Sequence, residues 1–509
     1  MELEKEMSNM KSSLNLGMTQ KLIASLSLFI LITGCMVGPD YTKPESQSAP
    51  SYKEVDGNTS GDGWKIAEPN EQGLRAKWWE IYKDPTLNEL INKVDIDNQN
   101  IIAAEAQYRQ ATALLTQARA ALFPTLTANG SGTRGTVNGG NNGNFSSVEQ
   151  TSNANLGASW VPDIWGQARR NIESSGANAQ ATAAQLDALR LSTQATLAQT
   201  YFQLRIADMQ IKMYDTTIKT YEKSLQITQN QYNAGIVTQL DVAQASTLLE
   251  STVALAIDVS LSRAQLEHAI AVLVGQTPST FTLKAQELSI DPKTGLVVSP
   301  VSKLVAELPD VPVGIPSTLL ERRPDIAAAE RQMAAANAKI GVAVAAFYPT
   351  LTISAAGGYQ GMDLPNLLSM PLRYWSIGPA LAQPLFDGGL RIGAYKQAGA
   401  VYDQNVALYR QTVLAAFQNV EDNLVALRML QSESKSQASA VKHAQDAVRI
   451  STNQYKSGII TYLDVATSQA AELSNERILM SLLNRQIAAH VGLITSLGGG
   501  WDVKQIADK

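Results

Sequence analysis

The sequence predicts a mainly α-helical chain with a small β part, built from two copies of one unit of strands and very long helices. Three observations support this fold class. Proline is absent from residues 163–277 and again from residues 385–509, and because proline breaks helix interiors, each tract can form uninterrupted helices. Apolar residues recur every seven positions in both tracts, and two short sequences occur twice at nearly the same offset.

The internal repeat is visible in two pairs of matching segments. Residues 230–243 and 453–466 are identical at ten of fourteen positions, with an offset of 223 residues. The string Pro-Thr-Leu-Thr at residues 124–127 recurs at residues 349–352, with an offset of 225. A tandem duplication of roughly 220 residues explains both matches. We therefore predict two repeats, residues 85–300 and residues 301–509.

The positions spaced by seven identify the long element of each repeat. Such spacing, sustained over several steps, is typical of helices that wind left-handedly around their neighbours. If residues 167–232 form one helix, that helix is about 100 Å long at about 1.5 Å per residue. The positions in the first copy are Leu197, Leu204, Ile211, Ile218, Leu225 and Tyr232, and those in the second copy are Val420, Leu427, Ser434, Val441, Val448 and Tyr455.

Each long tract is then predicted to turn back on itself. Gly235 and Gly458 suit a backbone with positive φ, and Thr238 and Thr461 are N-cap candidates for a returning helix. Each repeat therefore contains a predicted helical hairpin.

Strand patterns precede each hairpin and predict the oligomeric state. Apolar residues alternate with small or polar ones at Ala154, Leu156, Ala158 and Trp160, and again at Leu351, Ile353, Ala355, Gly357 and Tyr359. We expect two strands per repeat and four per chain. Four strands cannot close a membrane barrel, because bacterial outer-membrane barrels need at least about 8 strands and open edges leave backbone groups unpaired in lipid. The chain must therefore oligomerise, and a homotrimer would supply a twelve-stranded barrel continued by a long coiled-coil α-helical barrel.

The N-terminal region predicts export and a lipid anchor. Residues 22–34 are uncharged and mostly apolar, and as a helix they would rise about 20 Å, too short for a hydrocarbon core of about 30 Å. Residues 1–34 are therefore a predicted signal peptide, whose true start is Met1, Met10 or Met18. Residues 32–35, Ile-Thr-Gly-Cys, resemble the lipobox of bacterial lipoproteins.

The lipobox resemblance implies how the mature chain begins. It implies N-palmitoyl and S-diacylglycerol groups on Cys35, the single cysteine, and we expect no other cofactor. Met36, where an aspartate would favour retention at the inner membrane, favours the outer membrane. Residues 35–84 are rich in Pro, Ser, Gly and charge without periodicity, so they are a predicted lipidated tether rather than a packed unit.

Nearly the whole mature chain resembles the TolC-like outer-membrane efflux factors, in their lipidated branch that serves resistance-nodulation-division pumps. The resemblance rests on the duplication and on the order of short strings at residues 35–41, 78–79, 84–85, 319–326 and 497–501. It implies a trimeric channel in the outer membrane that extends into the periplasm. It also implies that the second hairpin closes the periplasmic end and that a periplasmic adaptor protein and an inner-membrane pump open it.

The resemblance also implies which residues act at that closed end. Asp464 and Leu463 would face the aperture, and Tyr455 and Asp241, with Tyr232, would hold adjacent hairpins together. Gly235 and Gly458 mark the turns that contact the adaptor or pump. Simpler interpretations remain for these residues, since seam packing explains the tyrosines and an acid in a first helical turn interacts favourably with the helix dipole.

The leading functional hypothesis is passive export of drugs and other toxic small molecules through this pore. A channel for type I protein secretion or metal-ion efflux is an alternative, and a structural coiled-coil envelope lipoprotein is an alternative from another class. We find no phosphate-binding loop, nucleophile elbow or metal-ligand spacing, so we expect no enzyme and no metal site. The net charge of −5 and the lack of a basic block make nucleic acid an unlikely partner.

Overall fold

The computed structural model of the 509-residue chain describes residues 36–44, 52–54, 77–138, 146–291, 295–309, 311, 322–362, 368 and 370–501. The chain separates into two compact units. Unit 1 comprises Met1–Pro44, Arg109–Ala181 and Ala329–Tyr409, and unit 2 comprises Glu45–Tyr108, Thr182–Ala328 and Arg410–Lys509. Cys35, the predicted lipidation site, and the predicted signal peptide lie outside the described residues.

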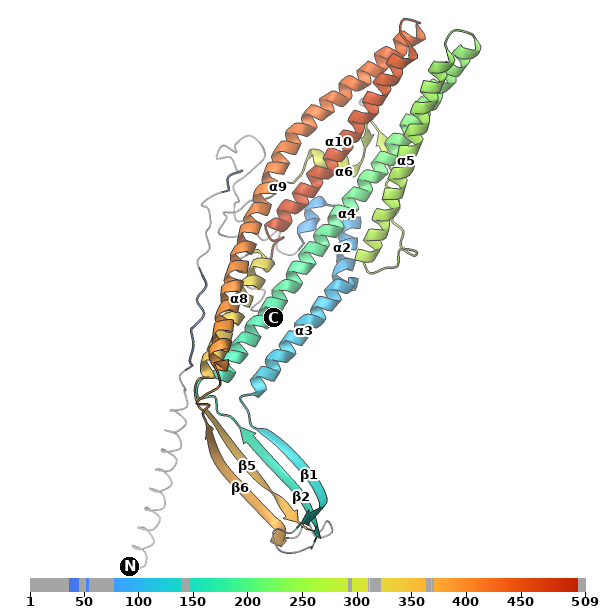
Figure 1. Ribbon diagram of the computed structural model, residues 1–509. Helices are drawn as coiled ribbons and strands as arrows, with labels where there is room; N and C mark the ends of the chain where they lie inside the picture. Colours follow the sequence, from blue (N-terminus) through green and yellow to red (C-terminus); the bar gives the residue numbers. More distant parts are fainter. Residues whose placement is uncertain are drawn as a thin grey trace, which may run out of the picture. The chain divides into compact units, whose positions relative to one another are not determined.

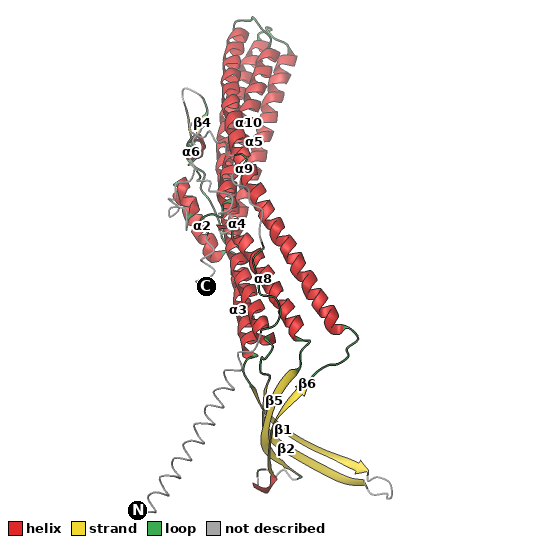
Figure 2. Cartoon of the chain, turned by 90° about the vertical axis from the view of Figure 1, so that its left-hand side faces the viewer, coloured by secondary structure: helices red, strands yellow, loops and turns green. Residues whose placement is uncertain are grey.

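Unit 1 contains the four predicted strands in one antiparallel sheet (Figures 1 and 2). Its order is β1-β2-β5-β6, so each repeat supplies one hairpin and the two hairpins pair through β2 and β5. The number of strands and their division between the repeats confirm the expectation from the sequence. The strands are β1 (Thr125–Asn138), β2 (Ser146–Trp160), β5 (Thr350–Gly361) and β6 (Arg373–Ala382).

The helices also follow the duplication. In the first copy, α4 (Gln167–Asn233) has 67 residues and α5 (Gln239–Leu273) has 35. In the second copy, α9 (Leu390–Lys456) has 67 residues and α10 (Tyr462–Ser496) has 35. The equal lengths confirm the internal repeat, and each pair forms a predicted helical hairpin (Figure 1). Shorter helices complete the fold: η2 (Trp78–Tyr82), α2 (Pro85–Asp97), α3 (Gln99–Ala120), α6 (Pro300–Ala306), α8 (Pro324–Ala345) and η4 (Met370–Leu372).

The core of unit 2 forms where α2 and η2 pack on the long helices. Trp78 is 1% exposed, and Tyr82 meets Phe202 edge to face with ring centroids 5.1 Å apart. Asp84 is the N-cap of α2. Its carboxylate accepts hydrogen bonds from the backbone N–H groups of Thr86 and Leu87. Unit 2 also contains a two-stranded sheet of β3 (Ser289–Ile290) and β4 (Val297–Val298).

The heptad seam is buried to different extents in the two copies. Leu197 and Leu204 are fully buried, but Tyr232 at the end of the first seam is 40% exposed. In the second copy the terminal position is covered, since Tyr455 is buried, as is Val441 earlier in the seam. The first seam therefore presents its terminal tyrosine to the outside of a single chain.

Two helices, α5 and α10, pass a length and hydropathy test for crossing a membrane. Half of the most apolar window of α10 is buried within unit 2, as expected for a core helix. On α5, Ile257 and Leu261 lie one turn apart and are both more than half exposed, so this face has no partner within the described part of the chain.

The expectation of an unpacked tether is wrong for the described parts of residues 35–84. Residues 36–44 contact helices of unit 1, and residues 52–54 pack on unit 2, where Tyr52 is 5% exposed and the backbone N–H of Lys53 donates to Glu421 at 2.7 Å. Composition predicted an extended chain, but a few side chains and backbone amides within it are enough to fix an extended segment to a surface.

Candidate functional site: a two-faced sheet and two hairpin tips

The sheet of unit 1 has an uncovered apolar face. The strand register aligns Leu126, Ala158, Ala355 and Ile377 in one row across all four strands. Five large apolar side chains on this face are exposed: Leu126 by 73%, Leu156 by 60%, Trp375 by 79%, Ile377 by 69% and Leu381 by 71%. Soluble proteins rarely expose a continuous apolar surface of this kind, so the face is suited to a membrane or an apolar partner.

The opposite face of the same sheet is polar and internally hydrogen bonded. Asn129 donates to Asn155 at 3.2 Å, and Asn155 donates to the Tyr374 hydroxyl at 2.9 Å. Thr125 donates to the carbonyl oxygen of Ser159 at 3.2 Å. A sheet with one lipid-compatible face and one hydrated face has the amphipathic pattern of an outer-membrane barrel wall.

The two outer strands of this sheet each have one hydrogen-bonded neighbour within the described residues. β1 pairs only with β2, and β6 pairs only with β5. Since backbone groups at an open edge have no water to bond in a bilayer, the sheet needs further strands on both sides to serve as a membrane wall.

Aromatic side chains gather at the ends of the strands that join the helices. Trp165 and Tyr348 stack with ring centroids 4.7 Å apart, and the indole N–H of Trp165 donates to the carbonyl oxygen of Pro349 at 2.8 Å. The Arg391 guanidinium lies over the Phe347 ring, 5.5 Å from its centroid. Aromatic side chains of this kind are enriched where a protein crosses from hydrocarbon to water.

The N-terminal segment, residues 36–44, is fixed next to these aromatic residues. The backbone N–H of Val37 donates to the carbonyl oxygen of Trp165 at 3.2 Å. The buried Arg170 guanidinium donates to the carbonyl oxygens of Val37 and Gly38, both at 3.2 Å, and to Asp40 at 2.7 Å. Arg170 was missed by the sequence reasoning, because an arginine within a long helix gives no signal of its partners.

A close approach of two glycines explains part of this segment's composition. A Cβ on Gly38 would lie 2.5 Å from the Cα of Gly341 in α8, and a Cβ on Gly341 would lie 2.8 Å from the Arg170 side chain. Gly38 also has a φ of +95°. The Val-Gly-Pro-Asp-Tyr string at residues 37–41 is therefore a packing sequence, in which Tyr41 donates to Glu330 at 2.5 Å.

The candidate aperture aspartates lie at matching positions in the two hairpin tips. Asp241 accepts from the backbone N–H and the hydroxyl of Thr238 at 2.8 and 2.7 Å. Asp464 accepts from the same groups of Thr461 at 3.0 and 2.8 Å. Both aspartates thus complete capping boxes, which is a local structural role. Asp464 is also exposed and remains available for a second role.

The two hairpins of unit 2 meet near their tips through tyrosines. Tyr455 is 8% exposed and donates to the side-chain oxygen of Gln231 at 2.6 Å. Its ring contacts Tyr462 edge to face at 5.5 Å, and Tyr221 donates to the carbonyl oxygen of Gln469 at 2.9 Å. Tyr232, in contrast, contributes no side-chain hydrogen bond within the described chain. The sequence identified Tyr455 but not Gln231 or Tyr462, because the partner in a long helical pair is set by the packing.

The turns themselves expose aliphatic side chains. Gly235 and Gly458 have φ values of +71° and +72°, as expected for left-handed turn glycines, and nothing lies within 4 Å of a Cβ placed on either. Exposure at equivalent positions is high in both copies, with Ile236 and Ile459 both 70% exposed. Leu463, a candidate aperture residue, is 54% exposed and its counterpart Leu240 is 66% exposed.

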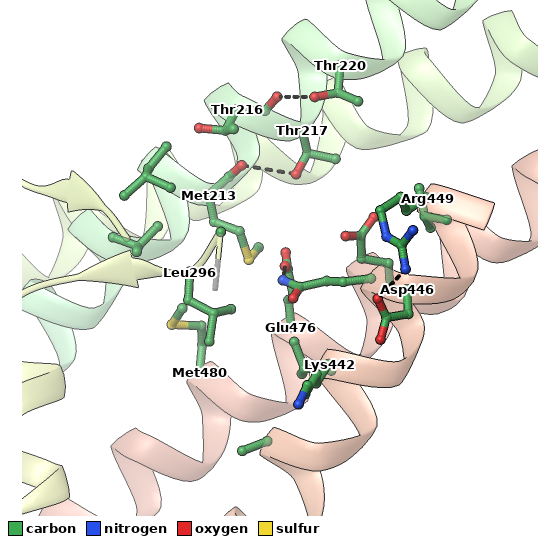
Figure 3. A pocket seen from close by; sticks show the side chains of 18 of the residues that line it. Met213, Thr216, Thr217, Thr220, Leu296, Lys442, Asp446, Arg449, Glu476 and Met480 are labelled. Carbon is green, nitrogen blue, oxygen red and sulfur yellow. Dashed lines mark hydrogen bonds and ion pairs between the residues drawn. The ribbon is translucent and has the colours of Figure 1, made fainter. Parts of the chain in front are cut away.

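A cavity of about 660 Å³ lies in unit 2 between α4, α9 and α10 (Figure 3). Glu472 and Glu476 of α10 line it, and Glu476 accepts from Gln445 at 3.1 Å. Burial, together with the charge of Glu476, raises the pKa of Glu472 to about 7. Glu472 therefore changes its charge near neutral pH.

No group of three or more His, Cys, Asp or Glu side chains within the described ranges is placed to hold a metal ion. His490 of α10 is buried. Tyr82 and the carbonyl oxygen of Pro309 lie 2.8 Å from its two ring nitrogens, and burial lowers its pKa.

Comparison with known proteins identifies the family. The family model described as outer membrane efflux protein matches the chain twice, at residues 90–276 and 315–499. The chain is 30% identical over 498 residues to the antibiotic efflux pump outer membrane protein ArpC of Pseudomonas putida, which covers 95% of this chain and 96% of that protein. It is 26% identical over 475 residues to the cation efflux system protein CusC of Escherichia coli, which covers 93% of this chain and 97% of that protein.

A solved structure agrees with these sequence matches. The outer-membrane channel OprN superimposes with a TM-score of 0.81 at 28% identity, covering 92% of this chain and all of that chain. One match of the family model falls within each half of the duplicated chain, and the uncovered sheet has the faces of a membrane wall. The chain therefore belongs to the outer membrane efflux protein family and is an outer-membrane channel protein of an efflux system.

Proposed function

We propose that three copies of this chain close a twelve-stranded barrel in the outer membrane and passively conduct drugs and other toxic small molecules out of the cell. The observation that supports this most directly is the sheet of unit 1, with an exposed apolar face and one open edge on each side. Three identical sheets joined edge to edge would satisfy every backbone group and give the apolar faces to lipid.

The proposal extends the tube through the helices into the periplasm. The exposed apolar pair Ile257 and Leu261 on α5 would then pack against a neighbouring copy. No residue of the chain supplies energy in this scheme, and no catalytic step is required. An inner-membrane pump of the resistance-nodulation-division class would deliver the substrate through a periplasmic adaptor.

The tips supply surfaces that fit this assembly. Ile236 and Leu240 of the first tip and Ile459 and Leu463 of the second are exposed in pairs at equivalent positions, so an adaptor could recognise both tips with one repeated apolar contact. Asp464 would line the aperture beside Leu463, where three carboxylates would attract cations and repel one another. Tyr455, with Asp241 nearby, would help to hold the second hairpin in place.

A lipid on Cys35 would strengthen attachment to the membrane. The following residue, Met36, lies against Gly166, and Val37 is bonded to Trp165. This contact would keep an acylated Cys35 close to the aromatic residues at the strand ends. Mass analysis of purified protein and of a Cys35→Ser variant tests this point, since only the former would have the mass of the lipid.

The main test is ion conductance of purified protein in planar lipid bilayers, combined with drug accumulation in cells that lack the gene. Channel conductance and increased drug accumulation are expected. A protein without conductance would contradict the proposal and favour a structural coiled-coil lipoprotein.

A second candidate within the channel class is metal-ion efflux, because the relative CusC is named as part of a cation efflux system. Sensitivity of the deleted strain to metal salts, but not to drugs, would support that function. Loss of a secreted protein without either sensitivity would instead indicate type I secretion.

A further inference from the structure

Each repeat contains the same three-residue string near its hairpin tip. Within one chain, one tyrosine and one glutamine of the two strings are hydrogen bonded to each other, and the other tyrosine and glutamine are not. Asn-Gln-Tyr occupies residues 230–232 in the first copy and residues 453–455 in the second. The tyrosine of the second copy bonds the glutamine of the first, since Tyr455 donates to Gln231 at 2.6 Å. The tyrosine of the first copy and the glutamine of the second, Tyr232 and Gln454, are exposed and have no side-chain hydrogen bond within the described chain.

The surroundings of the two glutamines are also equivalent. In the first copy, Leu225, Thr228 and Gln231 form the surface that Tyr455 meets. The duplication places Val448, Ser451 and Gln454 at the same positions of the second copy. An aliphatic residue, a hydroxyl and an amide recur in the same order, so the second copy has the side-chain chemistry that Tyr455 already recognises. Gln454 is exposed and Val448 is half-buried, while Ser451 is 8% exposed.

The hydroxyls of the two surfaces are held in the same way. Thr228 donates to the carbonyl oxygen of Ser224 at 3.0 Å, and Ser451 donates to that of Val448 at 3.2 Å. Each hydroxyl thus donates to a carbonyl oxygen of its own helix. In the first copy the Thr228 side chain also lies within hydrogen-bonding reach of Tyr455, whose hydroxyl donates to Gln231. In one chain the first acceptor is used and the second is left open.

A closed ring of repeats offers one partner for the open surface. If chains are arranged head to tail around an axis, repeat two contacts repeat one of its own chain on one side and repeat one of the next chain on the other. The hydrogen bond from Tyr455 to Gln231 lies in the joint between the two repeats of one chain. We propose that Tyr232 donates a hydrogen bond to Gln454 of a neighbouring copy of this chain, which makes the joint between chains the counterpart of the joint within the chain. This inference rests on the proposed ring assembly and adds to it the residues of one intermolecular contact.

The joint between chains and the joint within a chain differ in the side chains that surround the tyrosine. Tyr462, which packs edge to face against Tyr455, is replaced at the equivalent position by Gln239. Ala245, which is buried beside them, is replaced by Ser468. The joint between chains is thus more polar than the joint within a chain and contains fewer aromatic contacts, so it is the weaker of the two.

Paired cysteines test the contact against an internal standard. Gln231→Cys with Tyr455→Cys reports the contact seen within the chain, and Tyr232→Cys with Gln454→Cys reports the proposed one. A short bifunctional maleimide applied to purified, full-length protein should link the first pair without increasing the size on denaturing gels. It should link the second pair into dimers and trimers. The wild-type chain, with Cys35 alone, controls for unrelated linkage, and Tyr232→Cys with Asn453→Cys controls for proximity.

A double-mutant cycle provides a readout that does not depend on crosslinker reach. Tyr232→Phe and Gln454→Leu should each accelerate heat dissociation of the trimer several-fold, and the double variant should dissociate no faster than the more affected single variant. Additive effects of the two substitutions would overturn the proposal.

Native mass measurement of the same samples separates the two levels of the argument. A trimer in which only the Gln231 and Tyr455 cysteines react contradicts the Tyr232 contact and leaves the channel assembly intact. A protein that is monomeric in detergent and in lipid contradicts the proposed assembly itself.

Discussion

A charge placed on each face of one strand tests which side of the sheet meets lipid. Ile377 and Ser376 are neighbours in β6, near the middle of the strand, and their side chains point to opposite faces. Ile377 is 69% exposed on the apolar face. Ser376 shares its face with Tyr374, which accepts from Asn155. Ile377→Arg and Ser376→Arg therefore add the same side chain at the same depth.

The expected costs differ strongly between the two faces. An arginine facing lipid costs roughly 2–4 kcal/mol near the bilayer midplane, so three copies in a trimer sum to roughly 6–12 kcal/mol if their effects add. Loss of the isoleucine from the lipid surface adds to this cost. On the hydrated face, a solvated arginine should change stability by less than about 0.5 kcal/mol per chain, as surface substitutions usually do.

Urea-induced unfolding in lipid vesicles, followed by the intrinsic fluorescence of the tryptophans, measures the difference. We expect Ile377→Arg to lower the midpoint strongly or to prevent insertion, with Ser376→Arg close to wild type. Equal effects of the two variants, or tolerance of Ile377→Arg alone, would refute the assignment of the apolar face to lipid.

Three further predictions concern other parts of the chain. Gly341→Leu should detach residues 36–44, because its side chain would displace Arg170. N-terminal sequencing after limited proteolysis should then find cleavage in this segment of the variant but not of the wild-type protein. Glu472→Gln should stabilise the protein at pH 8 by about 1–2 kcal/mol after allowance for partial exposure. The pKa of Glu472 is raised from 4.5 to about 7 in the folded state, so the stability of the wild-type protein falls as the pH rises between these values. Melting temperatures of variant and wild type that differ by the same amount at pH 4 and at pH 8 would contradict this. Tyr455→Phe should weaken the contact with Gln231 by about 1 kcal/mol. If this contact holds the closed state, the open probability of the channel should rise roughly five-fold. Single-channel records that do not change would show that Tyr455 has no part in closing.

The sequence alone determined the architecture because its signals are local and periodic. The missing prolines and the seven-residue spacing predicted the long helices that the structure shows as α4 and α9, and the alternation around Leu156 and Ile353 predicted strands. The turns at Gly235 and Gly458 followed from their position after the seam and before a capping threonine. The duplication then related one half of the chain to the other without any knowledge of contacts.

Tertiary structure decided which residues meet. The link from Tyr455 to Gln231 spans 224 positions, and the bonds from Arg170 to Val37, Gly38 and Asp40 join a helix to a segment more than a hundred residues away. Such pairs depend on the register between long helices and on where an extended segment crosses them. Periodicity fixes which face of a helix is buried, but it does not determine the neighbour against which that face packs. The fold could therefore be predicted from the sequence, whereas the contacts at the hairpin tips and at the N-terminal segment could not.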